Sequence, residues 1–288
     1  MIREDTRRGC KWCDHTQIVV SPLGNFARAN WCSKCSAVCN ICDNIGFTMT
    51  QDDLGRETAT RCICRETQRK IDLFNSAKIP CQFYDATFDN FIVDANLTAK
   101  SALSQAKFLL KNHRKKLWRG LLFMGGVGTG KTRLVCSMAR DYTLTHGIPC
   151  LFKEFTALLS EIKSGYDQGL SESHVLNAIN SIEILIVDEL GKGRGSDWEI
   201  NILDTIITSR YNMRKTTFFT TNYTDNIRTT FSEKTSAKSA SEGMQEFMKS
   251  ETLEQRVMSR IYSRLKEMCD FVEFKGSDFR QPSGEIIA

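Results

Sequence analysis

Residues 125–132 read GGVGTGKT, and the fold follows from this stretch. It fits the pattern G-x-x-x-x-G-K-[ST], whose glycines let backbone N–H groups close around a phosphate. A helix that starts at Lys131 would present the positive end of its dipole to the same anion. The Lys131 ammonium is expected to reach the outer phosphates of a nucleotide, and the Thr132 hydroxyl to ligate Mg²⁺. The predicted phosphate loop comprises Gly125, Gly126, Val127, Gly128, Thr129, Gly130, Lys131 and Thr132.

The segments on both sides of this loop alternate between strand and helix patterns. An apolar strand at 121–124 precedes the loop, and a helix at 132–146 follows it. Further strands are predicted at 150–155, 184–190, 216–222 and 270–274, and further helices at 102–118, 157–166, 197–215 and 251–267. The continuous apolar run at 184–190 is typical of a parallel sheet that is covered on both faces. The alternation predicts an α/β fold with helices around a doubly wound parallel sheet.

Polar side chains end two of these strands. Asp188 closes the strand at 184–190, where it could complete the Mg²⁺ coordination, and Glu189 could polarise water for attack on the γ-phosphate. Asn222 ends the strand at 216–222 and could hydrogen-bond that water or the γ-phosphate. An acidic pair at a strand end is often only the start of a loop, and Asn often only initiates a turn. Together with the phosphate loop, the three residues predict hydrolysis rather than binding alone.

Composition places the chain among ordinary globular proteins. Its 288 residues are 41% hydrophobic and 25% charged, and the net charge of +5 permits nucleic-acid contact without requiring it. No apolar run approaches the ~20 residues of a membrane span, and the charged N-terminus lacks the apolar stretch of a signal peptide. We therefore expect a cytoplasmic protein with reduced thiols and no membrane contact. The basic run at 111–119 is either a DNA contact or a solvated helix face.

Eight of the twelve cysteines fall between residues 10 and 64. They form two quartets with the spacing of four-thiolate zinc sites. The first quartet is Cys10, Cys13, Cys32 and Cys35, and the second is Cys39, Cys42, Cys62 and Cys64. An iron–sulfur cluster is the main competitor for these thiols, and pairing across the quartets is an alternative to sequential pairing. His15 could replace one thiolate, although a surface histidine is the simpler interpretation.

The motifs together resemble a known group. GGVGTGKT, IVDELGKGRG, FFTTN and LEQRVMSRIYSRLKEMCDFVEFKGSDFR are similar, in this order, to AAA+ ATPases of the DnaC/DnaI helicase-loader type and to the related IstB transposition helpers. The resemblance covers about residues 80–288 and implies a P-loop NTPase core of three layers, α/β/α. It also extends to the second cysteine quartet, which is similar to the N-terminal zinc region of some loaders, whereas the first quartet has no such match.

The resemblance also implies roles for individual residues. Lys131 and Thr132 match the Walker A motif, Asp188 and Glu189 match the Walker B motif, and Asn222 matches sensor 1. Arg260 stands at the position of an arginine finger that enters a neighbouring subunit, with Arg256 as the nearby alternative and a solvated helix stripe as the plainer interpretation. Arg280 resembles the late arginine of sensor 2.

These features divide the chain into predicted parts. A cysteine-rich zinc domain at 1–78 is followed by a linker at 79–100 and an AAA+ domain at 101–288, in which 229–250 reads as a polar insertion. The implied cofactors are ATP, Mg²⁺ and two Zn²⁺. The implied function is the loading of a replicative helicase onto single-stranded DNA by a homo-oligomer that assembles with ATP. The alternatives are an IstB-like transposition helper and a zinc nucleic-acid adaptor that uses ATP only as a switch.

Overall fold

The centre of the molecule is one parallel sheet. The computed structural model describes residues 10–35, 39, 41–93, 97–113, 118–167, 169, 171–225, 251–275 and 278–279. The sheet has five strands in the order β6-β7-β8-β5-β9, and every pairing is parallel. The strands are β5 (Gly120–Gly125), β6 (Cys150–Glu154), β7 (Ile184–Asp188), β8 (Thr216–Thr221) and β9 (Cys269–Phe274).

Helices cover both faces of this sheet. One face packs against α1 (Ile63–Ser76), α2 (Leu97–Lys111) and α3 (Lys131–Arg140), and the other against α4 (Phe155–Asp167), α5 (Glu172–Ser181), α6 (Asp197–Asn212), α9 (Leu253–Val257) and α10 (Ser259–Met268). In β5, Leu121 and Phe123 belong to the first core, whereas Leu122 and Met124 belong to the second. Both faces of the strand are therefore buried, which explains its continuous apolar run. The expected α/β/α P-loop architecture is confirmed.

Several helix ends differ from the prediction. The strand expected at 150–155 ends at Glu154, and Phe155 begins α4 with its ring buried in the second core. The helix expected at 132–146 stops being regular at Arg140 and continues as the π-helical turn η3 (Asp141–Thr145). The helix expected at 251–267 is broken at Met258, whose φ of 69° lies in the left-handed region. The helix expected at 102–118 begins earlier, as α2, and residues 114–117 lie outside the described part.

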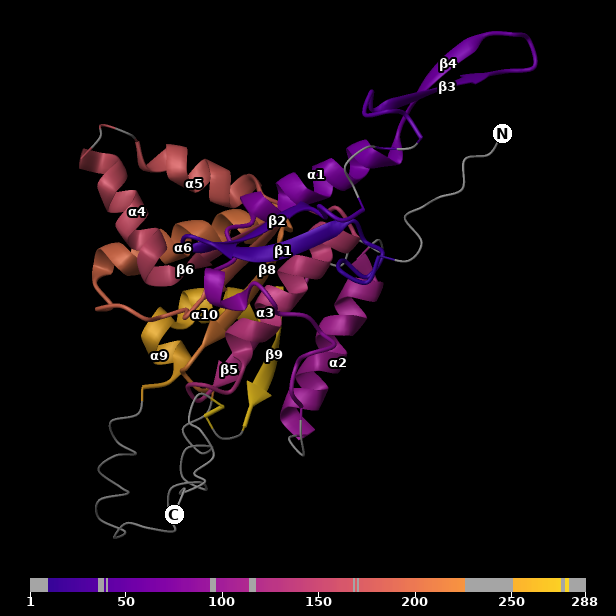
Figure 1. Ribbon diagram of the computed structural model, residues 1–288. Coiled ribbons are helices and arrows are strands. Elements are labelled where there is room, and N and C mark those ends of the chain that lie inside the picture. The colour runs from indigo at the N-terminus through magenta and orange to yellow at the C-terminus, as the bar shows by residue number, and fades with distance from the viewer. Residues whose placement is uncertain are drawn as a thin grey trace, which may run out of the picture.

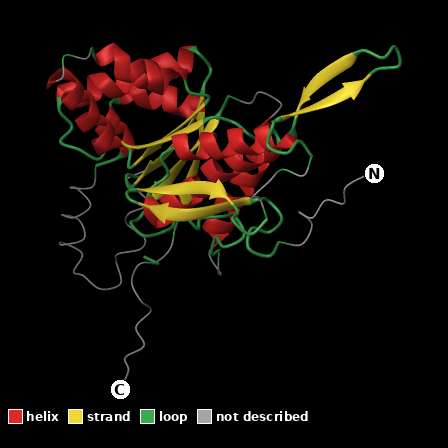
Figure 2. Ribbon diagram, turned by 45° about the horizontal axis from the view of Figure 1, so that its top comes forward, coloured by secondary structure: helices red, strands yellow, loops and turns green. Residues whose placement is uncertain are grey.

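The cysteine-rich segment forms two antiparallel hairpins. These are β1 (Ile18–Leu23) with β2 (Phe26–Trp31), and β3 (Phe47–Gln51) with β4 (Glu57–Arg61). Ala27 and Ala29 of β2 share one core with α1 and with the helices on that face of the sheet. The β3–β4 hairpin instead projects away from the body (Figures 1 and 2). The first hairpin thus shares a core with the central sheet and its helices, whereas the second extends away from them (Figures 1 and 2).

The connection between the hairpins and the sheet is ordered. The amide of Ala27 donates to Ile79 O at 2.9 Å, and the 3-10 turn η1 (Cys81–Phe83) begins with Cys81 donating to Asn25 O. The domain boundaries proposed at residues 78 and 100 stay predictions, and residues of the first core lie on both sides of each boundary. The insertion at 229–250 lies outside the described residues. Within the described ranges, none of the helices combines the length and the apolar character that a bilayer span needs.

Candidate functional site

The phosphate loop joins the end of β5 to the start of α3. Gly125 has φ 140°, and a Cβ there would stand 2.1 Å from the backbone oxygen of Phe274 on the neighbouring strand. Gly130 has φ 97° and caps α3, so that Lys131 is the first helical residue. Both positions require glycine, because a side chain would meet the backbone or strain it. The loop therefore holds its N–H groups and the helix N-terminus around one spot, as a phosphate cradle requires.

Lys131 lies inside the curve of this loop. Its side chain is buried, and Nζ donates hydrogen bonds to Gly125 O at 2.9 Å and to Gly126 O at 2.6 Å. These contacts place the ammonium where the loop amides converge. A cation at this position complements the charge of a polyphosphate.

Asp188 and Thr132 meet beside the loop. Thr132 Oγ1 donates to Asp188 Oδ1 at 2.9 Å, and Thr220 of β8 donates to the same oxygen at 2.5 Å. Burial raises the pKa of Asp188, and the hydrogen bonds from Thr220 and Thr132 oppose that shift. A hydroxyl and a carboxylate are the oxygen ligands that Mg²⁺ prefers, and a divalent cation would offset the buried charge. The residues present therefore fit a magnesium ion.

Glu189 follows Asp188 and is anchored at two points. Its backbone has φ 57°, and its N–H donates to Thr220 Oγ1 at 3.0 Å. Its carboxylate forms an ion pair with Lys192, which also lies 3.4 Å from Glu154 Oε1 at the tip of β6. Thr220 and Lys192 were not among the residues predicted from the sequence. Thr220 could have been found as a hydroxyl residue near the end of the strand predicted at 216–222, whereas no sequence pattern indicates Lys192.

A cavity of about 270 Å³ connects these groups. Its walls come from the phosphate loop, the tips of β7 and β8, and two aromatic residues. The lining residues are Phe83, Val127, Gly128, Thr129, Gly130, Lys131, Thr132, Arg133, Glu189, Thr220, Asn222 and Phe279. The structure thus brings the predicted Lys131, Glu189 and Asn222 to one pocket. The roles of these residues remain predictions.

The candidate arginines lie in different settings. Arg256 is mostly buried and donates from Nε to Gly191 O at 2.6 Å, so that it clamps the loop after β7. Arg260 on α10 leaves 70% of its side chain exposed, although it forms an ion pair with Asp204 of α6. Arg260 is absent from the lining of its own chain's pocket in the described part. Arg280 lies outside the described residues.

The basic run at 111–119 is described only at its ends. Arg119 donates to Asp270 Oδ1 at 2.6 Å and also bonds the carbonyl of Cys269. The ring of Trp118 packs edge-on against Tyr211, with 6.0 Å between centroids. These two residues serve contacts within the chain. A DNA contact by the rest of the run stays a prediction.

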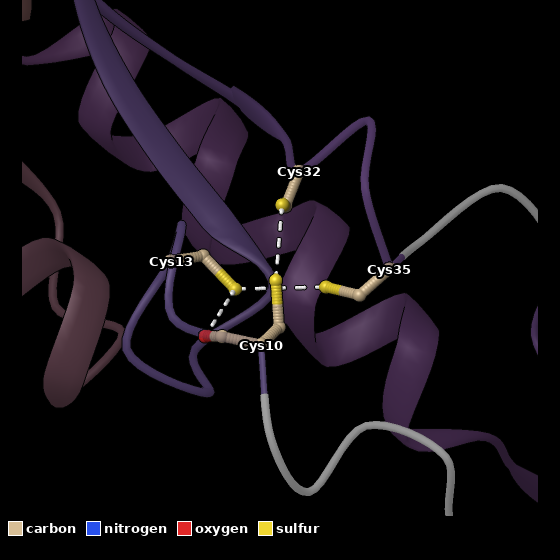
Figure 3. Close-up of side chains that lie close together, drawn as sticks. All are labelled: Cys10, Cys13, Cys32 and Cys35. Atoms are coloured by element: carbon tan, nitrogen blue, oxygen red, sulfur yellow. Dashed lines mark hydrogen bonds between the residues drawn. The ribbon is translucent and has the colours of Figure 1, made fainter.

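The eight cysteines form two compact clusters. Within each quartet the four Sγ atoms lie within 4.8 Å of one another. In the first quartet, Cys10 and Cys32 are 3.8 Å apart and Cys13 and Cys35 are 3.5 Å apart (Figure 3). A tetrahedral zinc ion with Zn–S bonds of about 2.3 Å separates its ligand sulfurs by about 3.8 Å. The spacing therefore suits one ion, and an iron–sulfur cluster would need the sulfurs further apart.

The second quartet has the same arrangement. Cys39 and Cys62 are 3.7 Å apart, and Cys42 and Cys64 are 3.5 Å apart. The structure thus brings the cysteines together in the sequential quartets and leaves His15 out of both groups.

The thiols of both clusters favour a cation. Burial, reinforced by the Cys35 thiol, raises the pKa of Cys13 to about 12. Burial, reinforced by the Cys42 thiol, does the same for Cys64. Despite burial, hydrogen bonds from the backbone and from the neighbouring thiols lower the pKa of Cys32 and of Cys42 to about 7, so each cluster favours some thiolates over others. Four thiolates this close repel one another, so a bound cation is the physical means of ionising them all. Both groups could hold zinc.

Comparison with known proteins gives the relationships of the chain. The family model described as "IstB-like ATP binding protein" matches residues 48–283. The replicative helicase loader DnaC of Escherichia coli (strain K12) is 26% identical over 150 residues, which are 52% of this chain and 60% of DnaC. Phage-like element PBSX protein XkdC of Bacillus subtilis (strain 168) is 24% identical over 222 residues, which are 73% of this chain and 77% of XkdC.

The fold has solved counterparts. The crystal structure of the DnaC helicase loader superimposes with a TM-score of 0.53 at 26% identity, and it covers 67% of this chain and 99% of that one. The alignment with curated DnaC sequences spans only 60% of their length. The region that the family model matches, residues 48–283, contains the phosphate loop, the tips of β7 and β8, and α10. Because the family model covers most of the sequence and every strand of the central sheet, the chain belongs to the family of IstB-like ATP binding proteins, the AAA+ ATPases related to DnaC.

Proposed function

We propose that this chain hydrolyses ATP in the pocket between the phosphate loop and the tips of β7 and β8. The hydrogen bond between Thr132 and Asp188 supports the proposal most directly, because it joins a hydroxyl and a carboxylate that could both ligate magnesium beside the loop. Lys131 and the loop amides would hold the phosphates. Bound Mg²⁺ would neutralise charge on the β- and γ-phosphates. Glu189 would accept a proton from the attacking water, and Asn222 would orient that water.

Hydrolysis is proposed to need a second copy of the chain. The pocket of one molecule is lined by its own residues on the loop side, whereas the exposed Arg260 lies on α10, away from that pocket. A homo-oligomer that forms with ATP would let Arg260 enter the neighbouring pocket and neutralise the transferring phosphoryl group. Arg280 is proposed as a further contact to the nucleotide from the same chain.

The partners are proposed from the relatives. DnaC is named a replicative helicase loader, and this chain is 26% identical to it over 150 residues. We propose that the chain loads a replicative helicase onto single-stranded DNA in the cytoplasm, with ATP binding driving assembly and hydrolysis driving release. Both cysteine quartets are proposed to hold structural zinc.

The β3–β4 hairpin is the proposed helicase contact. The hairpin and the residues that flank it, 39–65, form the second cysteine module, which exposes large apolar side chains. More than half of each side chain is exposed at Ile45, Met49, Leu54 and Ile63. Residues 39–65 contain three arginines and four acidic residues, so the charge of this segment does not favour binding to a nucleic acid. A two-stranded hairpin whose faces are exposed to solvent is only marginally stable by itself, and it becomes more stable when a partner covers its apolar side chains.

The test combines turnover with capture of the helicase. Purified protein should hydrolyse ATP faster with single-stranded DNA, and Lys131→Ala should abolish turnover. Immobilised protein should retain the purified replicative helicase of its host, and the pair Met49→Asp and Leu54→Asp should weaken that retention while ATP binding persists. Turnover indifferent to Lys131 would contradict the ATPase proposal. Failure to retain the helicase with or without ATP would contradict the loader proposal alone.

A transposition helper is the second candidate, because the matching family model is described as IstB-like. Such a protein would bind duplex DNA and a transposase rather than a helicase. Retention of the transposase and stimulation of turnover by duplex DNA would favour it. An adaptor that uses ATP as a switch would bind ATP but show the same turnover with Glu189→Gln as without it.

A further inference from the structure

Trp12 is the most exposed of the four tryptophans. Its side chain is 75% exposed, whereas Trp31, Trp118 and Trp198 are all partly buried. Tryptophan is highly buried on average, so a bare indole on an ordered turn is unusual. Trp12 also lies before residue 48, where the match to the family model begins. The family relationship therefore supplies no role for it.

The first cysteine cluster brings Trp12 and a cation together. Trp12 lies between Cys10 and Cys13 on one turn, and Lys34 lies between Cys32 and Cys35 on the other. The sulfurs of these turns converge (Figure 3), and the Lys34 ammonium stands 5.6 Å from the centroid of the Trp12 ring.

The central residues of both turns thus meet on the surface of the module. Lys11 precedes Trp12 on the same turn and is exposed. A bound metal ion would fix both turns and with them the distance between the indole and Lys34.

The net charge of the first cysteine module, residues 10–35, differs from that of the second, residues 39–65. The first module contains three basic residues and one acidic residue. These are Lys11, Arg28 and Lys34, and Asp14. The second module carries more carboxylates than arginines and exposes aliphatic side chains instead. An aromatic face flanked by cations suits a stacked base and its phosphates, whereas a bare aliphatic surface suits a protein.

We propose that the first cysteine module binds single-stranded nucleic acid, with one base stacked on Trp12 and the adjoining phosphates beside Lys34 and Lys11. Stacking requires only a planar face, so the contact is tolerant of sequence. The module would hold the strand outside the ATP pocket. This inference goes beyond the proposed function, which assigns single-stranded DNA to the ATPase assembly and names no nucleic-acid contact on the cysteine modules.

The experiment measures binding of a fluorescent (dT)20 strand to the full chain. Trp12→Ala should weaken binding roughly 5- to 150-fold, which corresponds to the 1–3 kcal/mol that one base stack contributes. Trp12→Phe should retain most of the affinity. Lys34→Gln should weaken binding less and reduce the salt slope by about 0.7, since one phosphate contact is lost. Intrinsic fluorescence should be quenched by (dT)20 in the wild type and less so in Trp12→Ala.

The controls separate this contact from folding and from the other proposals. Leu23→Ala removes another exposed apolar side chain of the same module and should bind (dT)20 as the wild type does. Metal content, thermal stability, turnover without DNA and helicase retention should be unchanged in Trp12→Ala. A parallel series with (U)20 shows whether DNA or RNA is preferred. The inference would be overturned if Trp12→Ala bound (dT)20 and (U)20 as tightly as the wild type does, or if the variant lost only helicase retention. Either result would leave the ATPase proposal intact.

Discussion

Thr132 donates a hydrogen bond to Asp188 across 2.9 Å, which ties the first turn of α3 to the tip of β7. The two residues are 56 positions apart, so the contact exists only because β5 and β7 lie in one parallel sheet with β8 between them. Thr220 of β8 bonds the same carboxylate oxygen. Three neighbouring elements thus hold one oxygen where a magnesium ion would bind.

The Thr132 hydroxyl is predicted to matter for metal use rather than for folding. Thr132→Val keeps the shape of the side chain but removes the ligand, so turnover should fall on the order of 100-fold. Thr132→Ser keeps the hydroxyl and should stay within a few-fold of the wild type. Steady-state ATP hydrolysis measured over a range of Mg²⁺ concentrations checks both. Equal activity of the two variants would remove Thr132 from the magnesium site.

Arg260 is predicted to act on a neighbouring molecule. Arg260→Ala should lower kcat about 1,000-fold, the effect typical of an arginine finger, with ATP affinity unchanged. Arg264 pairs with the same Asp204 but is less exposed, so Arg264→Ala is the matched control and should keep most of the turnover. Mixing Arg260→Ala with Glu189→Gln should restore part of the activity, because each supplies what the other lacks. A mixture as inactive as its parts would argue against action in trans.

The sequence was informative wherever chemistry depends on short local spacing. The phosphate loop needs only consecutive residues, and the quartets Cys10–Cys35 and Cys39–Cys64 follow from two turns each. The five strands were predictable because both faces are buried and the apolar runs are continuous. Asp188 and Asn222 followed as the polar ends of such runs.

Long-range packing was not visible in the sequence. Phe155 is an apolar residue of high β propensity that follows Lys153 and Glu154, so the predicted strand was extended through it. The chain instead begins α4 there, and the ring packs in the second core. Met258 breaks a helix that local propensity would continue, and Val257 and Ile261 on either side of the break are both buried in the second core. Ile71 and Phe74 of α1 join the ATPase core although they follow the cysteine block. Tertiary contacts decided all three, and a single sequence carries no signal for them.

The two cysteine clusters are predicted to contribute differently to stability. Cys13 and Cys42 are equally buried, at 6% exposure, and each belongs to one quartet. The first cluster anchors a hairpin whose Ala27 and Ala29 lie in the main core, so Cys13→Ser should lower the Tm by several degrees. Cys42→Ser should leave the main transition unchanged, since the β3–β4 hairpin projects away from the body (Figure 2).

Metal analysis and calorimetry on the same preparations check this prediction. The wild type should contain two zinc ions per chain, and each variant one. A chelator should reproduce both losses at once. Equal Tm values for the two variants would show that the first hairpin does not depend on its metal for docking.

Arg210 is predicted to be among the most costly side chains to remove. It is fully buried, and its guanidinium donates to Thr217 Oγ1 at 2.8 Å, to Ile179 O at 2.9 Å and to Thr216 O at 2.6 Å. Arg210→Met would leave these acceptors unpaired, so unfolding free energy should fall by about 3 kcal/mol or more. Arg214→Met, four residues on and exposed, should change it by less than about 0.5 kcal/mol. Urea unfolding followed by circular dichroism measures both, and similar values would contradict the structural role.

His146 is predicted to make the fold less stable in mild acid. Burial lowers the pKa of His146, and the nearby His113, whose ring centroid is 4.1 Å away, lowers it further, while Asp141 opposes the shift. The unfolded chain therefore takes up this proton first as the pH falls below about 6.5, and stability is lost until the lower folded pKa is reached. His146→Gln should reduce the difference in Tm between pH 7.5 and pH 5.5. Asp141→Asn removes the opposing carboxylate and should enlarge it. An unchanged pH dependence in both variants would show that another group governs the acid response.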